Sequence, residues 1–201
     1  MNFFRKNIFF CFVFVFSFLY PNFLFSQKNE NDSDQSSLKI AGFSGEVFFK
    51  INENLETISN SGIFLPVKST IKTGENGKIT LSNNRGLEIR VKENSVFSTL
   101  DWKTFKLESG LAGFKSSSNP PDFGYSIGTK HFSAVLKQGI ITIKANDQLS
   151  RLAVLKGWSL ISSITGKYSL VNPKEEIAGG ESELSEKYLV TDELYFAHYW
   201  N

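Results

Sequence analysis

The sequence predicts an all-β fold, either a β-sandwich or jelly roll or a short β-solenoid, with a short amphipathic helix at its C-terminal end. The main observation is a series of short segments in which apolar and polar residues alternate, as they do in strands with one buried face. Turn-forming residues separate these segments about every ten residues, which is typical of sheets built from short strands. The 201 residues, of which 41% are hydrophobic, suffice for one domain with its own core.

The clearest strands are predicted between Leu65 and Leu100. The pair Asn76-Gly77 separates two short runs, and Asn-Gly most readily supplies the two positive φ angles of a tight hairpin turn. A second turn is predicted at Asn83–Gly86, and beyond it Leu87, Ile89 and Val91 alternate with charged residues. We therefore expect a β-meander in which each strand pairs with the next.

Further strands are predicted on both sides of this meander. Glu46–Ile51 alternates in the same way, and Gly42 and Gly45 before it are expected at turn or bulge positions. A short strand at Phe105–Leu107 is expected to end at Ser109-Gly110, and the double proline within Ser116–Asp122 predicts a loop. The remaining alternating segments are Phe123 to Ile127, Ile141 to Ile143, Leu152 to Val154 and Lys167 to Val171.

Residues 1–26 are predicted to be a secretory signal peptide, because a basic pair precedes an apolar run and Ser26 is a small residue at the cleavage position. An uncleaved membrane anchor is the alternative, since the apolar run is nearly long enough to cross a bilayer. Residues 27–37 contain no large apolar side chain and predict a flexible spacer. The expected organisation is therefore a signal peptide at 1–26, a spacer at 27–37, a β domain at 38–180 and a helix at 181–201.

Cleavage would leave a chain without cysteine, because Cys11 is the only one, so no disulfide is expected. It would also remove two of the 22 basic residues and leave 20, equal to the 20 acidic residues. A balanced charge argues against nucleic acid as a partner and against a polybasic membrane patch. The mature chain is expected in the periplasm or cell envelope, without a membrane span.

The last segment, Glu181 to Trp200, is predicted to be helical. Its apolar and aromatic residues recur every three or four positions, Gly179-Gly180 precedes it, and Ser182 is available as an N-cap. We expect this helix to pack on the sheet of its own domain.

No catalytic, metal or cofactor motif is present. The two histidines, His131 and His198, have no metal-ligand spacing and no adjacent nucleophile motif. The acidic residues Glu175, Glu176, Glu181 and Glu183 are expected to lie in a solvated loop and a first helical turn. We therefore predict a protein that is not an enzyme and needs no cofactor.

A set of turn residues and alternating aliphatics resembles the FecR-type domain of iron-siderophore signal transducers and of stand-alone bacterial envelope proteins. The matching positions between Ile40 and Gly180 are Gly45-Glu46-Val47, Leu65, Ile71, Thr73-Gly74, Gly77, Ile79, Leu81, Gly86, Ile89, Val91, Asn94-Ser95, Leu107, Gly110, Phe123, Ile127, Thr129, Gly139, Ile141, Ile143 and Val154–Gly157. The sequence departs from the family at Gly139-Ile140, where Gly-Thr is usual, and at Arg85-Gly86, where Asp-Gly is usual. Only seven residues precede the apolar run, so sigma-factor binding is not expected to carry over.

The resemblance implies a protein-interaction or ligand-sensing module, with Gly45, Gly74, Gly77, Gly86 and Gly139 as motif and turn positions. We expect an exported, non-catalytic module that binds an envelope protein or a cell-surface polymer through a sheet edge or end loops. One alternative is a carbohydrate-binding or hydrolytic protein with Trp102, Tyr125 and Trp158 as stacking platforms, although such aromatics commonly fill a core. The other is a membrane-tethered signalling regulator.

Overall fold

The computed structural model describes residues 37–51, 54–117 and 119–196. The predicted signal peptide and nearly all of the predicted spacer lie outside the described residues. The all-β prediction is confirmed. The elements are β1 (Leu38–Ser44), β2 (Val47–Ile51), β3 (Asn54–Thr57), β4 (Phe64–Leu65), β5 (Thr70–Thr73), β6 (Lys78–Ser82), β7 (Leu87–Val91), β8 (Val96–Thr99), β9 (Thr104–Ser116), β10 (Tyr125–Gly128), β11 (Phe132–Ala145), β12 (Ser150–Ser163), β13 (Tyr168–Val171), β14 (Glu175–Gly179), β15 (Tyr188–Leu189) and α2 (Asp192–Phe196).

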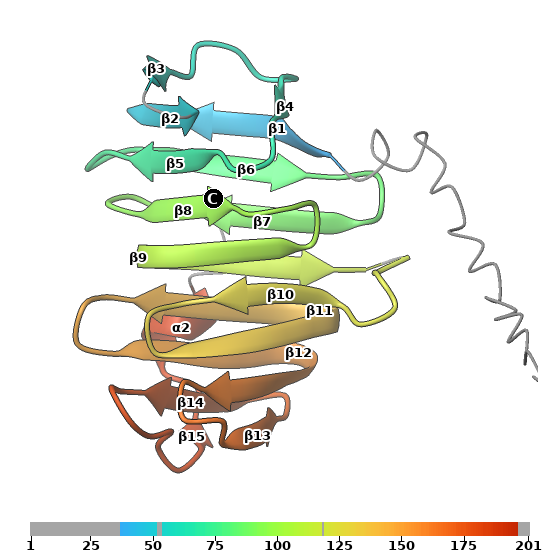
Figure 1. The fold of residues 1–201 in the computed structure, drawn as a ribbon, viewed down its shortest axis with the longest axis vertical. Helices are drawn as coiled ribbons and strands as arrows, with labels where there is room; N and C mark the ends of the chain where they lie inside the picture. The colour runs from blue at the N-terminus through green and yellow to red at the C-terminus, as the bar shows by residue number, and fades with distance from the viewer. Residues whose placement is uncertain (1–36, 52–53, 118, 197–201) are drawn as a thin grey trace, which may run out of the picture.

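The strands form two layers that run the length of the molecule (Figure 1). The first layer has the order β4-β1-β6-β7-β9-β11-β12-β14-β15, and the second has the order β3-β2-β5-β8-β9-β10-β11-β12-β13. The strands β9, β11 and β12 occur in both orders, because the first part of each lies in one layer and the second part in the other. One hydrogen-bonded sheet is thus folded over on itself.

The hydrophobic core fills the space between the layers. Phe97 on β8 belongs to the second layer, and Phe114 on the later part of β9 belongs to the first layer. Both are fully buried, and their ring centroids lie 6.2 Å apart. The Phe105 ring stacks on Phe97 at 5.9 Å and lies 6.2 Å from Tyr125. Inward-facing residues of both layers therefore share one apolar interior, as in a sandwich.

The predicted β-meander is wrong at Asn76-Gly77. The strands β5 and β6 do not pair with each other; β5 pairs with β2 and β8, and β6 pairs with β1 and β7. The chain therefore crosses between layers here, and neither Asn76 nor Gly77 has a positive φ. Gly77 is required for another reason, since a Cβ there would lie 2.0 Å from the Glu46 carbonyl oxygen.

The second predicted turn, Asn83–Gly86, does join two paired strands, β6 and β7. Gly86 has φ +77°, and the Asn83 Oδ1 accepts hydrogen bonds from the backbone N–H groups of Arg85 and Leu87, both at 3.0 Å. An Asn side chain that replaces backbone acceptors in this way stabilises a tight turn. After β7 the chain returns to the second layer through Asn94, whose φ is +53°.

Several strands are longer than predicted. The strand that begins at Thr104 does not end at Ser109-Gly110 but continues to Ser116. Gly110 has φ +94°, and there β9 bends from its pairing with β8 to its pairing with β7. The strands at Glu46–Ile51 and Lys167–Val171 are confirmed within one residue at their N-terminal ends.

The C-terminal helix exists but begins ten residues after the predicted N-cap. Residues after Ser182 are extended instead: Leu184 forms a bridge with Gly179, and β15 pairs with β14. Helix α2 starts at Asp192, and the Thr191 carbonyl accepts its first hydrogen bonds from Leu194 and Tyr195. Leu194 is fully buried, so the helix packs on the domain as expected. In the described part of the chain, no helix has the length and apolar character needed to cross a membrane.

Candidate functional site

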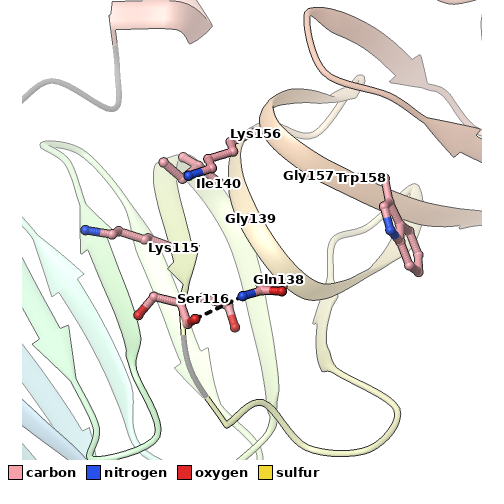
Figure 2. A pocket seen from close by; sticks show the side chains of 9 residues that line it. Lys115, Ser116, Gln138, Gly139, Ile140, Lys156, Gly157 and Trp158 are labelled. Atoms are coloured by element: carbon pink, nitrogen blue, oxygen red, sulfur yellow. Dashed lines mark hydrogen bonds between the residues drawn. The ribbon is translucent and has the colours of Figure 1, made fainter.

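A groove crosses the outer surface where β11 and β12 pass from one layer to the other, beside the C-terminal end of β9; we call it the corner groove (Figure 2). Its floor is a cross-strand row of small residues, Ser116, Gly139 and Gly157, which the register places side by side. Its volume is about 440 Å³. That size lies within the range of small-ligand sites.

The two sides of the corner groove differ in chemistry. One side is the row Lys115–Ile140–Lys156, in which each lysine pairs directly with Ile140. The other side carries Gln138 and Trp158 together with Ser117. Gln138 is positioned by its own hydrogen bond, in which its Nε2 donates to the Ser117 carbonyl at 3.1 Å.

Two of the three floor positions carry no side chain, because the backbone permits none there. Gly139 and Gly157 have φ of +139° and +77°, in the region that favours glycine. A Cβ at Gly139 would lie 2.1 Å from the Lys156 carbonyl oxygen, and one at Gly157 would lie 2.2 Å from that of Gln138. The same geometry that bends the two long strands therefore keeps the groove open.

An apolar surface adjoins the groove on the hairpin β12–β13. Leu160 and Leu170 face each other across the two strands, Trp158 lies two residues before Leu160, and Tyr168 lies two residues before Leu170. Their exposed fractions are 46% for Trp158, 38% for Leu160, 48% for Leu170 and 71% for Tyr168. We call these four residues the apolar ladder. Contiguous exposed apolar residues of this kind mark interaction surfaces.

The apolar ladder lies on an edge of the sheet. Among the described strands, β13 pairs only with β12. The Lys187 ammonium donates to the Leu170 carbonyl at 3.2 Å and to the Glu175 carboxylate at 3.0 Å. A lysine at an open edge discourages unspecific strand pairing, and here it covers one backbone acceptor of β13.

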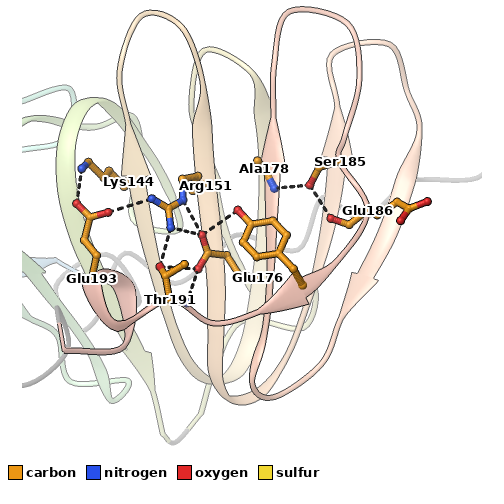
Figure 3. A network of polar contacts seen from close by, with 9 residues as sticks. Lys144, Arg151, Glu176, Ala178, Ser185, Glu186, Thr191 and Glu193 are labelled. Atoms are coloured by element: carbon orange, nitrogen blue, oxygen red, sulfur yellow. Dashed lines mark hydrogen bonds and ion pairs between the residues drawn. The ribbon is translucent and has the colours of Figure 1, made fainter.

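A cluster of polar contacts joins the C-terminal segment to β11, β12 and β14 (Figure 3). We call it the C-terminal clamp; its members are Lys144, Arg151, Glu176, Tyr188, Thr191 and Glu193. The fully buried Glu176 carboxylate accepts hydrogen bonds from Arg151 Nε at 2.6 Å, from the Tyr188 hydroxyl at 3.0 Å, and from the N–H and hydroxyl of Thr191, both at 2.9 Å. Arg151 also donates to Glu193 at 2.9 Å, and Lys144 pairs with the same carboxylate. This buried carboxylate corrects the expectation of a solvated Glu176.

The electrostatics of the clamp follow from these contacts. Burial disfavours the charged guanidinium, but the hydrogen bond and the charge of Glu176 outweigh it and raise the pKa of Arg151. Burial and the hydrogen bond to Glu176 raise the pKa of Tyr188. The hydrogen bond from Lys144 lowers the pKa of Glu193. The clamp therefore contains an ionised guanidinium and a neutral phenol at neutral pH, which suits a structural role.

The three predicted stacking residues do not form one site. Tyr125 is fully buried, so its ring has no face for an external ligand, and burial raises the pKa of its phenol. Trp102 borders a separate small cleft with Leu65 and Asp101, and the Arg85 and Lys103 cations lie 5.2 and 5.5 Å from its ring. Only Trp158 lines the corner groove.

The five predicted glycines divide between two roles. Gly45, Gly74 and Gly77 lie so close to Asn76 or Glu46 that an added Cβ would collide with one of these two residues. Gly86 has a positive φ in the turn between β6 and β7. Of the five, only Gly139 lies in the corner groove, where it contributes to the floor. Lys115, Gln138 and Lys156 were missed, because an isolated surface lysine or glutamine carries no signal until the register brings it beside others.

The structure also brings together a serine and a histidine that the sequence separates. Ser150 Oγ lies 3.0 Å from His131 Nδ1, but the two residues are 0% and 1% exposed, so a substrate cannot reach the pair without local opening. Within the described residues, no group of three His, Cys, Asp or Glu could hold a metal ion. The His131–Ser150 contact is thus best explained as a hydrogen bond within the core.

Comparison with known proteins supports the fold. No family model matches the chain, and no curated protein matches it in sequence. A crystal structure of a candidate anti-sigma factor from Parabacteroides distasonis is similar to it, with a TM-score of 0.51 and 14% identity over 60% of this chain and 59% of that one. A second crystal structure of a candidate anti-sigma factor from that species has a TM-score of 0.49 at 15% identity, over the same shares of the two chains. The match spans about three fifths of these proteins, and at this identity it shows a shared fold.

Proposed function

We propose that this chain is an exported FecR-like module of a cell-envelope signalling system and that it acts by binding another envelope protein, without catalysis. Two findings support this class of function. The fold is shared with a candidate anti-sigma factor. The glycines on which the FecR resemblance depends occupy turns, bends and close backbone approaches, where a fold family would need them.

The observation that carries the proposal is the apolar ladder on the edge hairpin. Four large apolar side chains on two neighbouring strands are exposed together, beside a strand whose outer edge lacks a partner strand among the described residues. Exposed edges are normally shortened, charged or covered. On β13, one lysine, Lys187, occupies a backbone acceptor of the apolar edge, and its side chain can move away. Such an edge suits regulated pairing with a specific partner.

The mode that fits is addition of a strand to β13. An extended segment of the partner would take the backbone groups along β13 and place alternate apolar side chains against Leu170 and Tyr168. Lys187 would leave the Leu170 carbonyl, which its long side chain can do without disturbing the fold. Its ammonium could then stay paired with Glu175, 3.0 Å away in the free protein.

Site-specific photo-crosslinking in the native envelope tests this proposal. A photoreactive residue in place of Tyr168 is expected to trap one partner protein, whereas the same residue in place of Lys72, on the exposed side of β5, is expected to trap none. The substitution Leu170→Lys should abolish the crosslink and leave the melting temperature nearly unchanged, since an exposed side chain contributes about half a kcal/mol or less.

Three results would contradict the proposal. Equal crosslinking from positions 168 and 72 would show that the apolar ladder is not a specific surface. A crosslink only to a second copy of this chain would replace the partner protein with a homodimer. Turnover of peptide or glycoside substrates by the purified protein would overturn the non-catalytic part.

A further inference from the structure

We propose that the corner groove binds an anionic saccharide, a sugar chain whose carboxylate groups pair with Lys115 and Lys156 while one ring stacks on Trp158. The groove shares Trp158 with the apolar ladder but includes no residue of β13, and the inference does not depend on the partner protein proposed above.

The two lysines that line the groove favour a ligand with negative charge. Lys115 and Lys156 are exposed on the same side, and the residues that line the groove include no acid. In the described part of the chain, neither lysine takes part in a salt bridge. The two side chains are therefore available to a ligand without breaking an existing ion pair.

The spacing selects a linear ligand with repeated charges. Lys115 and Lys156 flank Ile140 in one cross-strand row, so their backbones are two strand spacings apart, or about 9.5 Å. A single carboxylate cannot contact both ammonium groups when the side chains extend straight outward. A chain of acidic sugars that lies along the row places separate carboxylates against the two lysines.

The opposite side of the groove suits sugar rings. Trp158 is 46% exposed and offers an aromatic face, to which the apolar C–H face of a pyranose binds. Gln138 and Ser117 line the groove on the same side and provide polar groups for hydroxyls. The bare floor over Gly139 and Gly157 lets a ring approach the backbone closely.

A peptide is the less suitable ligand. At the groove, β9 is paired with β7 and β11, and β11 is paired with β9 and β12. The backbone hydrogen bonds of these strands are thus already used within the sheet. A peptide that crosses them would find few partners for its own N–H and C=O groups, whereas sugar hydroxyls stay hydrated at an open groove.

Titration calorimetry with the purified protein and trigalacturonate tests the proposal, with the fully methyl-esterified trimer as a neutral ligand of the same shape. We expect trigalacturonate to bind and the ester to bind at least tenfold more weakly. Binding should weaken as salt rises from 20 to 500 mM, because the exposed ion pairs are screened. Each of Lys115→Gln and Lys156→Gln should weaken binding about fivefold, the upper range for an exposed ion pair.

Matched variants keep the test specific. Lys72→Gln removes an exposed lysine on β5 that does not line the groove, and it should leave the affinity unchanged. Trp158→Ala should abolish detectable binding of trigalacturonate, while Leu170→Lys should leave it intact and so separate this site from the β13 edge. Melting temperatures of all variants report whether each one is folded.

Three results with the two sugar ligands would overturn the inference. They are no binding of trigalacturonate by the folded protein, equal binding of the methyl ester, and equal weakening by Lys72→Gln and Lys115→Gln. Tight binding of hexaglutamate, lost with the same two lysines, would also overturn it and assign the groove to an acidic peptide.

Discussion

Replacement of Glu176 by alanine is expected to release the C-terminal segment from β12 and β14. The Glu176 carboxylate is fully buried and accepts four hydrogen bonds, two of them from Thr191, which directly precedes α2. Through Arg151 it is also linked to Glu193 in the helix. Without this acceptor, the described segment from Tyr188 to α2 keeps mainly the β14–β15 pairing and the buried side chain of Leu194.

The expected cost is about 3 kcal/mol of the free energy of unfolding. Removal of one partner from a buried ion pair costs roughly 3 to 5 kcal/mol, because the other charge is left without compensation. The lower value applies here, since the Arg151 side chain is 20% exposed to water and retains Glu193. For a domain of 150–250 residues, this corresponds to a melting temperature lower by about 6 to 12 °C.

Thermal unfolding and amide hydrogen exchange measure the two parts of this prediction. Exchange at Thr191, Leu194 and Tyr195 should quicken more than exchange in β9, because the segment opens locally before the core unfolds. Glu175→Ala is the matched control. The Glu175 carboxylate, next to Glu176 in the chain, binds Lys187 at the surface, so its removal should cost much less free energy of unfolding. A Glu176→Ala protein with unchanged melting temperature and unchanged exchange would show that the clamp does not hold the segment.

Three further predictions concern the bends, the pH response and the sheet edge. Gly157→Ala should cost about 3 kcal/mol, because φ is +77° and the new Cβ would lie 2.2 Å from a backbone oxygen, whereas Gly113→Ala, with open space around it, should stay within about 0.5 kcal/mol in a denaturant titration. The pKa of Tyr188 is raised above its ordinary value of about 10, so the native state holds this proton to higher pH than the unfolded state does. The contribution of this shifted pKa to the free energy of unfolding is complete below pH 10 and is lost as the pH rises through the raised pKa. The free energy of unfolding, measured from pH 9 to 11.5, should therefore decline less steeply with pH for Tyr188→Phe than for the parent. Lys187→Ala should expose the Leu170 carbonyl and promote self-association, which sedimentation velocity would detect as a larger species than in the parent at equal concentration.

The strand pattern could be predicted locally, but the pairing of the strands could not. Alternation at Leu87, Ile89 and Val91 shows that one side of a strand is buried, because side chains point to opposite faces with a period of two. It does not show which layer the strand joins. Asn76-Gly77 therefore suggested a hairpin, although the chain crosses between the layers at this turn. Gly77 is necessary because its backbone lies close to the carbonyl of Glu46, a residue distant in sequence.

The candidate sites depended even more on tertiary structure. Residue type alone singled out Trp158, yet it selected Tyr125 equally, since nothing local distinguishes a core aromatic from an exposed one. Glu176 looked like a solvated acid, and only the tertiary structure provides the partners that allow a carboxylate to be buried, namely Arg151 on β12 and Thr191 before α2.

The sequence by itself determined the all-β class, the positions of most strands and the Asn83–Gly86 turn, because these follow from side-chain alternation and from residues close together in the chain. Tertiary structure alone decided the two layers, the bends at Gly110, Gly139 and Gly157, and the grouping of Lys115, Ile140 and Lys156 in one row. The register of long strands fixes that row through contacts between residues far apart in sequence, which no local pattern encodes.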